Sequence, residues 1–194
     1  MADRPRSRAR DAAAGGVAAA VWALQEPVDR RILRCDYSDV AILGKAVTGG
    51  RRWWLAGTAL HVANGMLFGL AYHEVRRRRA VDPCVLALAM ALGEHLALYP
   101  LGGLVDRFHP RRGTPGIPPL MASPRVFAQA TWRHALFGAV LGALASLSAE
   151  EGTPPRRASP SGRAALARHR SHPRAARPDG IRTRRTAALR TAWT

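Results

Sequence analysis

Three long apolar runs decide what this chain can fold into. Residues 53–75, 84–104 and 127–147 are runs of 23, 21 and 21 residues with very few ionisable side chains. A helix needs about 20 apolar residues to cross the roughly 30 Å hydrocarbon core of a bilayer. Apolar helices of soluble domains are usually shorter, and three of this length are difficult to bury in one small chain. We therefore expect these three runs to be membrane-spanning helices.

A fourth apolar segment, residues 12–24, is shorter and consists mostly of Ala and Gly after four Arg residues in the first ten positions. A basic start followed by a short apolar stretch is also typical of a signal peptide. No small-residue cleavage site follows, however, and Trp22, Leu24 and the sequence Gln25-Glu26-Pro27 favour a helix that reaches a membrane interface. Ala and Gly would let this helix pack tightly against the others. The predicted fold class is all-α: a polytopic membrane protein with a four-helix transmembrane bundle and a disordered basic C-terminal tail.

Charge divides the chain into three parts. Residues 1–11 form a basic N-terminal segment, residues 12–148 the transmembrane domain, and residues 149–194 a tail rich in Arg, Pro and Ala. The tail has no apolar periodicity, so it cannot bury enough surface to order itself. Two roles stay open for it: a segment attracted to anionic lipid headgroups, or a merely solvated tail. Its only aromatic residue is Trp193, so nucleic acid is an unconvincing partner.

The short connection between the second and third runs sets the expected orientation. It contains the four consecutive residues Arg76, Arg77, Arg78 and Arg79. Basic clusters at helix ends mark the cytoplasmic side of a membrane, and four helices would place both termini on that same side. The segment 25–52 also carries six Lys or Arg residues, but four acidic residues partly offset them. We expect both termini to be cytoplasmic.

The two longer connections then lie on the outer side. Residues 37–45 are typical of a short interfacial helix that ends before Gly49-Gly50. Residues 105–126 are rich in turn-forming types and predict little regular structure. The only two cysteines, Cys35 and Cys84, would lie on opposite sides of the membrane, so they cannot form a disulfide with each other. Two cysteines also exclude a disulfide-rich scaffold and a multi-cysteine zinc module.

One pattern occurs twice. The spacing His-x-x-x-Gly-x-x-x-Gly is found at His61, Gly65 and Gly69 and again at His134, Gly138 and Gly142. Pro27 precedes the first histidine, and Pro100 the second, by the same 34 positions. We interpret this as a duplicated helix–loop–helix unit with both copies in the same orientation. Positions four apart share one helix face, where Gly allows two backbones to approach closely, so the histidines are expected to face the bundle interior.

The histidines also share a depth. At 1.5 Å per residue, His61, His95 and His134 lie about 12, 14 and 10 Å from the outer ends of their helices. They therefore occupy one layer in the outer half of the membrane. Four further polar residues are close to this layer: Asn64, Glu94, Tyr99 and Arg133.

Three explanations compete for this polar layer. The first is a buried network that fixes helix register, with Glu94 paired to Arg133. The second is proton or small-solute handling, because His titrates near neutrality and burial can raise the pKa of a carboxyl group. The third is a haem or transition-metal site with His61, His95 and His134 as ligands. Motifs of hydrolytic enzymes are lacking, so the sequence predicts neither catalysis nor a required cofactor.

The chain also resembles a known group of proteins. The residues that carry this likeness are Glu26-Pro27, His61 with Phe68-Gly69-Leu70-Ala71-Tyr72, His95 with Tyr99-Pro100-Leu101-Gly102-Gly103-Leu104, and His134. Over about residues 12–147 it is similar to small bacterial inner-membrane proteins of the YagU type and to uncharacterised actinobacterial membrane proteins. The resemblance implies a multi-pass protein of the bacterial cytoplasmic membrane and supplies no established catalytic residues. Alongside solute handling and metal binding, it leaves a structural reading, in which the glycine stripes pack against a membrane partner or a second copy.

Overall fold

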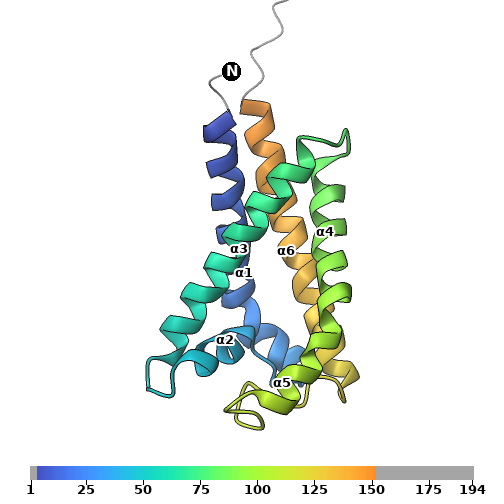
Figure 1. Cartoon of the computed structure of the whole chain (residues 1–194). Helices are drawn as coiled ribbons and strands as arrows, with labels where there is room; N and C mark the ends of the chain where they lie inside the picture. The colour runs from blue at the N-terminus through green and yellow to red at the C-terminus, as the bar shows by residue number, and fades with distance from the viewer. Residues whose placement is uncertain (1–3, 152–194) are drawn as a thin grey trace, which may run out of the picture. The chain divides into compact units, whose positions relative to one another are not determined.

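The computed structural model describes residues 4–151, which form an all-α protein (Figure 1). The elements are α1 (Arg4–Ile32), α2 (Asp39–Val47), α3 (Trp53–Arg76), α4 (Pro83–Leu98), the 3-10 turn η1 (Tyr99–Leu101), α5 (Gly102–Phe108) and α6 (Pro124–Glu151). Within this described range there is no sheet, only an isolated bridge between Tyr37 and Gly116. The all-α prediction is confirmed. The predicted tail lies outside the described residues except for its first three positions, which end α6.

The first helix differs most from its prediction. α1 has 29 residues instead of the expected 13, so it includes most of the basic segment 1–11 and continues through Pro27. Proline lacks a backbone N–H and normally ends or kinks a helix. Here the turn beyond it is held from outside, because the Asp29 carboxylate bonds to Gln129 and Arg133 of α6. Tertiary contacts thus override the local stop signal.

The expected short helix in the first long connection is present as α2. The Ser38 hydroxyl caps its start by accepting a hydrogen bond from the backbone N–H of Ala41 at 3.1 Å. Asp39 then carries negative charge in the first turn, where the helix dipole favours it. α2 ends at Val47, just before Gly49-Gly50.

The third predicted helix is a composite. Asp82 caps α4 through the backbone N–H groups of Cys84 and Val85, and α4 is followed directly by η1 and α5, so helical structure reaches Phe108. The following connection consists of turns and bends up to Pro124, as its turn-forming residues predict, and it also packs against the core. Its Leu120 is buried, and the Asp106 carboxylate accepts the backbone N–H of Leu120 at 2.7 Å. The sequence pattern missed this because the ordering contact comes from α5.

The apolar side chains of the long helices point outward. On α3 the buried residues are Gly57, His61, Gly65, Gly69, Tyr72 and His73. The exposed residues on the same helix include Trp54, Leu55, Leu60, Met66 and Leu67. Two helices, Trp53–Arg76 and the composite Pro83–Phe108, are long and apolar enough to cross a membrane, and only 22% and 17% of their most apolar stretches are buried. α1 and α6 do not reach this threshold, because charged residues such as Asp29 and Arg133 lower their hydropathy.

Side-chain contacts show which helix ends lie together. Near one end, Arg76 of α3 bonds to Asp11 of α1, Tyr72 of α3 to the backbone of Pro83, and Cys84 of α4 to Ser146 of α6. α2 and α5 lie at the opposite end (Figure 1). α1 and α4 therefore run in one direction, and α3 and α6 in the other.

Candidate functional site

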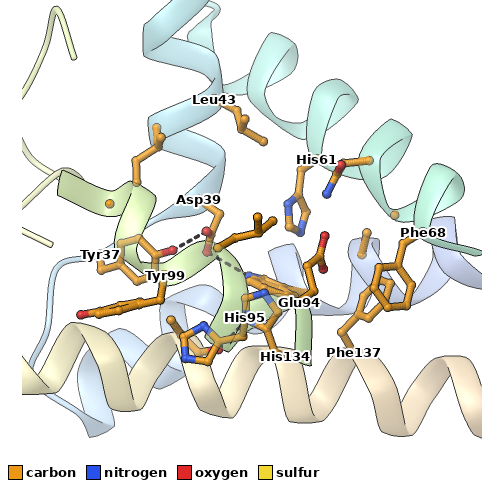
Figure 2. Close-up of a pocket in the computed structure, with 18 of the residues that line it drawn as sticks. Tyr37, Asp39, Leu43, His61, Phe68, Glu94, His95, Tyr99, His134 and Phe137 are labelled. Atoms are coloured by element: carbon orange, nitrogen blue, oxygen red, sulfur yellow. Dashed lines mark hydrogen bonds between the residues drawn. The ribbon is translucent and has the colours of Figure 1, made fainter. Parts of the chain in front are cut away.

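A cavity of about 270 Å³ lies between α1, α3, α4 and α6 (Figure 2). Six of the seven residues predicted for the polar layer line it: His61, Asn64, Glu94, His95, Tyr99 and His134. The seventh, Arg133, lies behind the cavity wall. Asp39 at the start of α2 and Trp22 of α1 also line the cavity. Six residues of the layer expected from helix depth therefore line one cavity.

The three histidines are packed through aromatic contacts and do not converge on one point. The Trp22 ring lies against both His61 and His134, with centroid distances of 5.1 and 4.6 Å. The His95 and His134 rings are tilted against each other at 4.7 Å. Trp22, which the sequence predicted near a membrane interface and not in the polar layer, thus lies between the His61 and His134 rings.

Hydrogen bonds fix the ring state of two histidines. His134 Nδ1 lies 2.8 Å from the backbone oxygen of Ala130, which can only accept, so Nδ1 carries the proton. His95 Nε2 lies 2.9 Å from the Thr131 hydroxyl, whose own proton is donated to the Phe127 carbonyl. His95 Nε2 must therefore be the donor. In the neutral form of each ring, the other nitrogen is unprotonated: Nε2 of His134 and Nδ1 of His95.

His61 is the least satisfied of the three. Its side chain is 7% exposed, and its Nε2 has no hydrogen-bond partner among the described residues. A buried polar atom without a partner costs about 1–3 kcal/mol. Figure 2 shows the ring projecting from α3 into the cavity, on the side facing Glu94.

The remaining predicted residues of the cavity have different roles. The Tyr99 hydroxyl donates to the backbone oxygen of Leu120 at 2.9 Å, so it fixes the connection after α5. Glu94 is half-buried, and His134 is its electrostatic neighbour. Asn64 lines the cavity from an exposed position of α3.

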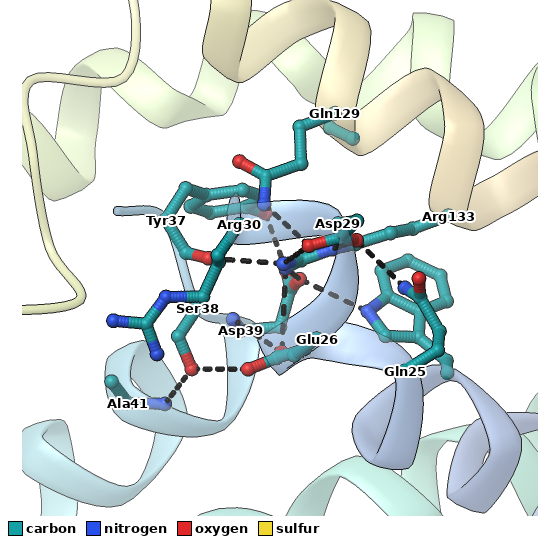
Figure 3. A network of polar contacts seen from close by, with 12 residues as sticks. Gln25, Glu26, Asp29, Arg30, Tyr37, Ser38, Asp39, Ala41, Gln129 and Arg133 are labelled. Carbon is teal, nitrogen blue, oxygen red and sulfur yellow. Dashed lines mark hydrogen bonds and ion pairs between the residues drawn. The ribbon is translucent and has the colours of Figure 1, made fainter. Parts of the chain in front are cut away.

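The predicted pair between Glu94 and Arg133 is wrong. The guanidinium of Arg133 instead forms two hydrogen bonds with Asp29, at 2.6 and 2.7 Å. It also reaches Asp39 at 2.9 Å and Glu26 at 3.3 Å (Figure 3). Arg133 directly precedes His134, and neighbouring residues of a helix point about 100° apart. Since His134 faces the cavity, Arg133 faces α1 and the start of α2.

The cluster around Arg133 holds three carboxylates against one cation, and it is well hydrogen-bonded. Ser38 donates to Glu26 at 2.6 Å, Gln129 to Asp29 at 2.6 Å, and Tyr37 to Asp39. Burial, and then the nearby Asp39 charge, raise the pKa of Glu26 to about 7. Burial also acts to raise the pKa of Asp39, but Arg133 brings it below its ordinary value. Asp39 therefore stays ionised, while Glu26 can hold a proton near neutral pH.

Asp39 joins this cluster to the cavity. It lines the cavity, and its carboxylate accepts hydrogen bonds from the Trp22 indole at 3.2 Å and from Arg133. From the sequence, Glu26, Asp29 and Asp39 were expected to offset basic residues of segment 25–52, and none of them was predicted to bind Arg133. The sequence did contain a signal for this cluster. Three acidic residues lie near Pro27 and the predicted short helix, and Arg133 is an arginine within an apolar run that needs acidic partners.

The two glycine stripes form two equivalent helix contacts. A Cβ atom at any of the four glycines would clash with the backbone of the neighbouring helix. These contacts pair Gly65 with Gly15, Gly69 with Asp11, Gly138 with Leu88, and Gly142 with Cys84. The first two join α1 to α3, and the last two join α4 to α6.

These contacts repeat with a constant offset of 73 positions along the chain. The same offset relates the ring pair Trp22–His61 to His95–His134. It also relates the bond from His73 to Asp11 to the contact of Ser146 with Cys84. Independent side-chain contacts therefore support the predicted duplication, with α1–α3 as one half and α4–α6 as the other.

Several ionisable residues are specific to the second half. At the same offset, Glu94 corresponds to Val21, His95 to Trp22, and Arg133 to Leu60. The first half makes the equivalent helix contacts without these charges. Helix packing alone therefore does not require Glu94, His95 or Arg133.

The basic cluster after α3 is only partly free. Arg76 reaches the Asp11 carboxylate at 3.0 Å, and His73 bonds the same oxygen at 2.7 Å, so this corner ties α3 to α1. Arg77 and Arg78 pair with Glu74 on the surface. Arg79 is exposed.

The described residues offer no ready set of metal ligands for the haem or transition-metal hypothesis. Among residues 4–151, no group of three or more His, Cys, Asp or Glu side chains is arranged to hold a metal ion. His61, His95 and His134 share the cavity, but Trp22 and the tilted ring contact keep their nitrogens from converging.

Comparisons of the chain with models of protein families, with curated proteins and with solved structures gave no match. The likeness to YagU-type membrane proteins stays a prediction.

Proposed function

We propose that this chain is a multi-pass membrane protein that binds a small polar solute in the cavity between its two halves, without catalysing a reaction. The observation that carries the proposal is the buried Nε2 of His61 in the cavity wall, which has no hydrogen-bond partner within residues 4–151. A polar atom left unpaired at this cost is explained if a bound solute completes its hydrogen bonding. In this proposal the membrane is the bacterial cytoplasmic membrane, with both termini in the cytoplasm.

The distribution of apolar residues supports the membrane part of the proposal. A soluble helix buries its large apolar side chains, whereas α3 and α4 bury Gly, Ala and His and expose Leu, Met and Trp. Hydrocarbon is the environment that suits such a surface. α1 and α6, which pack closely against α3 and α4, would then be the two more polar spans of a four-helix bundle.

The duplication supports the solute-binding part. Membrane carriers built from repeated units place their substrate sites near the bilayer midplane, where the repeats meet. Here Trp22 and His61 come from the first half, and Glu94, His95 and His134 from the second. The charges unique to the second half give the cavity polar groups that helix packing does not explain.

Thiol labelling of cysteine variants tests the proposal. In full-length protein with Cys35→Ser and Cys84→Ser, Asn64→Cys places a thiol at the cavity, and Leu67→Cys places one on the outer face of the same helix. The reagent is 2-hydroxyethyl methanethiosulfonate, applied to protein in liposomes. Thiolates form in water and not in hydrocarbon, so Asn64→Cys is expected to react at least about tenfold faster.

Two results would contradict the proposal in different ways. Fast labelling of Leu67→Cys in liposomes would place the outer face of α3 in water and remove the membrane part. Slow labelling of both variants, with Asn64→Cys becoming reactive only after denaturation, would show a cavity closed to small polar molecules.

A further inference from the structure

We propose that the solute is a small organic cation whose ammonium group donates hydrogen bonds to Glu94 and to Nε2 of His134. This inference rests on the proposed function and names the chemical class of the solute. It follows from the hydrogen-bonding capacity, the charge, and the aromatic walls of the cavity.

The cavity offers acceptors that no protein donor uses. His134 donates through Nδ1 and His95 through Nε2, so in the neutral form of each ring the other nitrogen can accept a hydrogen bond. Glu94 adds a half-buried carboxylate next to His134. A solute that matches these groups has to donate hydrogen bonds.

Most donors around the cavity are already committed. The Trp22 indole donates to Asp39, and the Tyr99 hydroxyl donates to the backbone of Leu120. The Asn64 amide, at the exposed side of the cavity, is the remaining lining side chain with N–H donors of its own besides the histidines. An anionic solute, such as a carboxylate or phosphate, would find few donors here.

Charge points in the same direction. Asp39 and Glu94 both line the cavity, whereas the guanidinium of Arg133 lies behind its wall and is bonded to Asp29, Asp39 and Glu26. Three carboxylates against one arginine leave that end of the cavity negative even when Glu26 holds a proton. A cation is therefore attracted, and its charge offsets the desolvation of Glu94.

The walls and the volume narrow the class further. Trp22, Phe68, Tyr99 and Phe137 supply aromatic surface, and aromatic faces attract cations. Sites for drug-sized ligands occupy roughly 300–1,000 Å³. At about 270 Å³, this cavity is suited to a compact amine.

A melting experiment on the full-length chain in detergent tests this inference. Three probes of similar size are compared at pH 7: 2-phenylethylammonium, neutral 2-phenylethanol and anionic 3-phenylpropanoate. The cation alone is expected to raise the melting temperature with concentration, because only it binds the folded state. Glu94→Gln should raise the apparent Kd for 2-phenylethylammonium by about tenfold or more, since a hydrogen bond to a charged group contributes about 1.5–3 kcal/mol. The surface variant Glu74→Gln is the matched control and should keep the full shift.

A second measurement does not depend on any change at Glu94. 2-Phenylethylammonium should slow the labelling of Asn64→Cys, and 3-phenylpropanoate should not. Equal effects of cation and anion, or a shift produced by Zn²⁺ and not by the amine, would overturn the inference. If Asn64→Cys is readily labelled but the amine neither protects it nor shifts melting, the cation assignment fails while the solute cavity stands. If Asn64→Cys cannot be labelled at all, the proposed function itself fails.

Discussion

Arg133 organises the end of the bundle where α2 lies, because several groups bond to it at once. Its side chain is fully buried and bonds carboxylates from α1 and α2, together with the backbone oxygen of Tyr37. Helix depth placed Arg133 and Glu94 in one layer, but depth does not give the direction of a side chain. The partners of Arg133 lie in α1 and at the start of α2, and their contacts depend on how α1 continues past Pro27.

Replacing Arg133 with Met should destabilise the folded protein strongly. The substitution removes the only cation from three clustered carboxylates, and losing one partner of a buried ion pair costs about 3–5 kcal/mol. We expect a clear loss of folded yield and of melting temperature in detergent. Arg125→Met, at an exposed position near the start of α6, is the control and should melt like the parent protein. Equal melting of the two variants would show that the cluster contributes little to stability.

Glu26 should make stability depend on pH near neutrality. Its pKa is about 7 in the folded protein and near 4.5 when unfolded. Between these values the folded state binds more protons, so its contribution to stability is largest below about pH 4.5 and declines as pH rises through 7. The melting temperature of the parent protein, taken relative to Glu26→Gln, should therefore fall from pH 5 to pH 8. A constant difference in melting temperature between the two proteins from pH 5 to pH 8 would show that the pKa of Glu26 is not raised.

At the scale of helices, small residues determine which elements pack together. The predicted stripes at Gly65, Gly69, Gly138 and Gly142 all lie at close backbone contacts, because a spacing of four gives one helix face directly from the sequence. The ends of elements were harder to predict. α1 extends beyond its predicted bounds at both ends, and η1 and α5 continue the helix that begins with α4. Contacts with distant segments hold these residues, although their local signals favour turns.

Gly69→Ala should weaken the contact between α1 and α3. The added methyl group would meet the backbone oxygen of Asp11, which cannot move aside like a flexible side chain. Overpacking of this kind costs typically 1–3 kcal/mol, more than the helix propensity gained from Ala. Gly93→Ala is a matched control on α4, where a Cβ atom would meet nothing within 4 Å, and it should be neutral or stabilising. Thermal melting of both variants compares them directly, and a stable Gly69→Ala would argue against tight packing here.

At the scale of the whole molecule, the two halves share their packing and differ in their charges. The offset of 73 positions carries helix contacts and ring contacts from α1–α3 to α4–α6, while Glu94, His95 and Arg133 replace apolar or aromatic residues of the first half. The repeat could be predicted from the sequence, because both halves have the same spacing of histidine and glycine residues. The assembled cavity could not be predicted, since it depends on Trp22, Asp39 and the angle at which the two halves meet.

The distribution of charge between the two ends of the bundle predicts its orientation in the membrane. The α3–α4 turn, with Arg76 to Arg79, lies at the end opposite α2 and α5. The basic residues near α2 are partly neutralised, since Arg30 pairs with Asp36. At the turn, Asp11 and Glu74 offset part of the charge of the four arginines, and the remaining positive charge favours the cytoplasmic side for that end.

Labelling in intact cells with a membrane-impermeant maleimide can decide this. Cys84 is exposed at the turn end, and Met121→Cys in a Cys84→Ser background places an exposed thiol at the opposite end. Cys35 should stay silent in both proteins, because it is buried and burial raises the pKa of its thiol. We expect Met121→Cys to be labelled from outside, and Cys84 only after the cells are opened. The reverse pattern would invert the bundle and place the polar cavity, together with the Arg133 cluster that borders it, toward the cytoplasm.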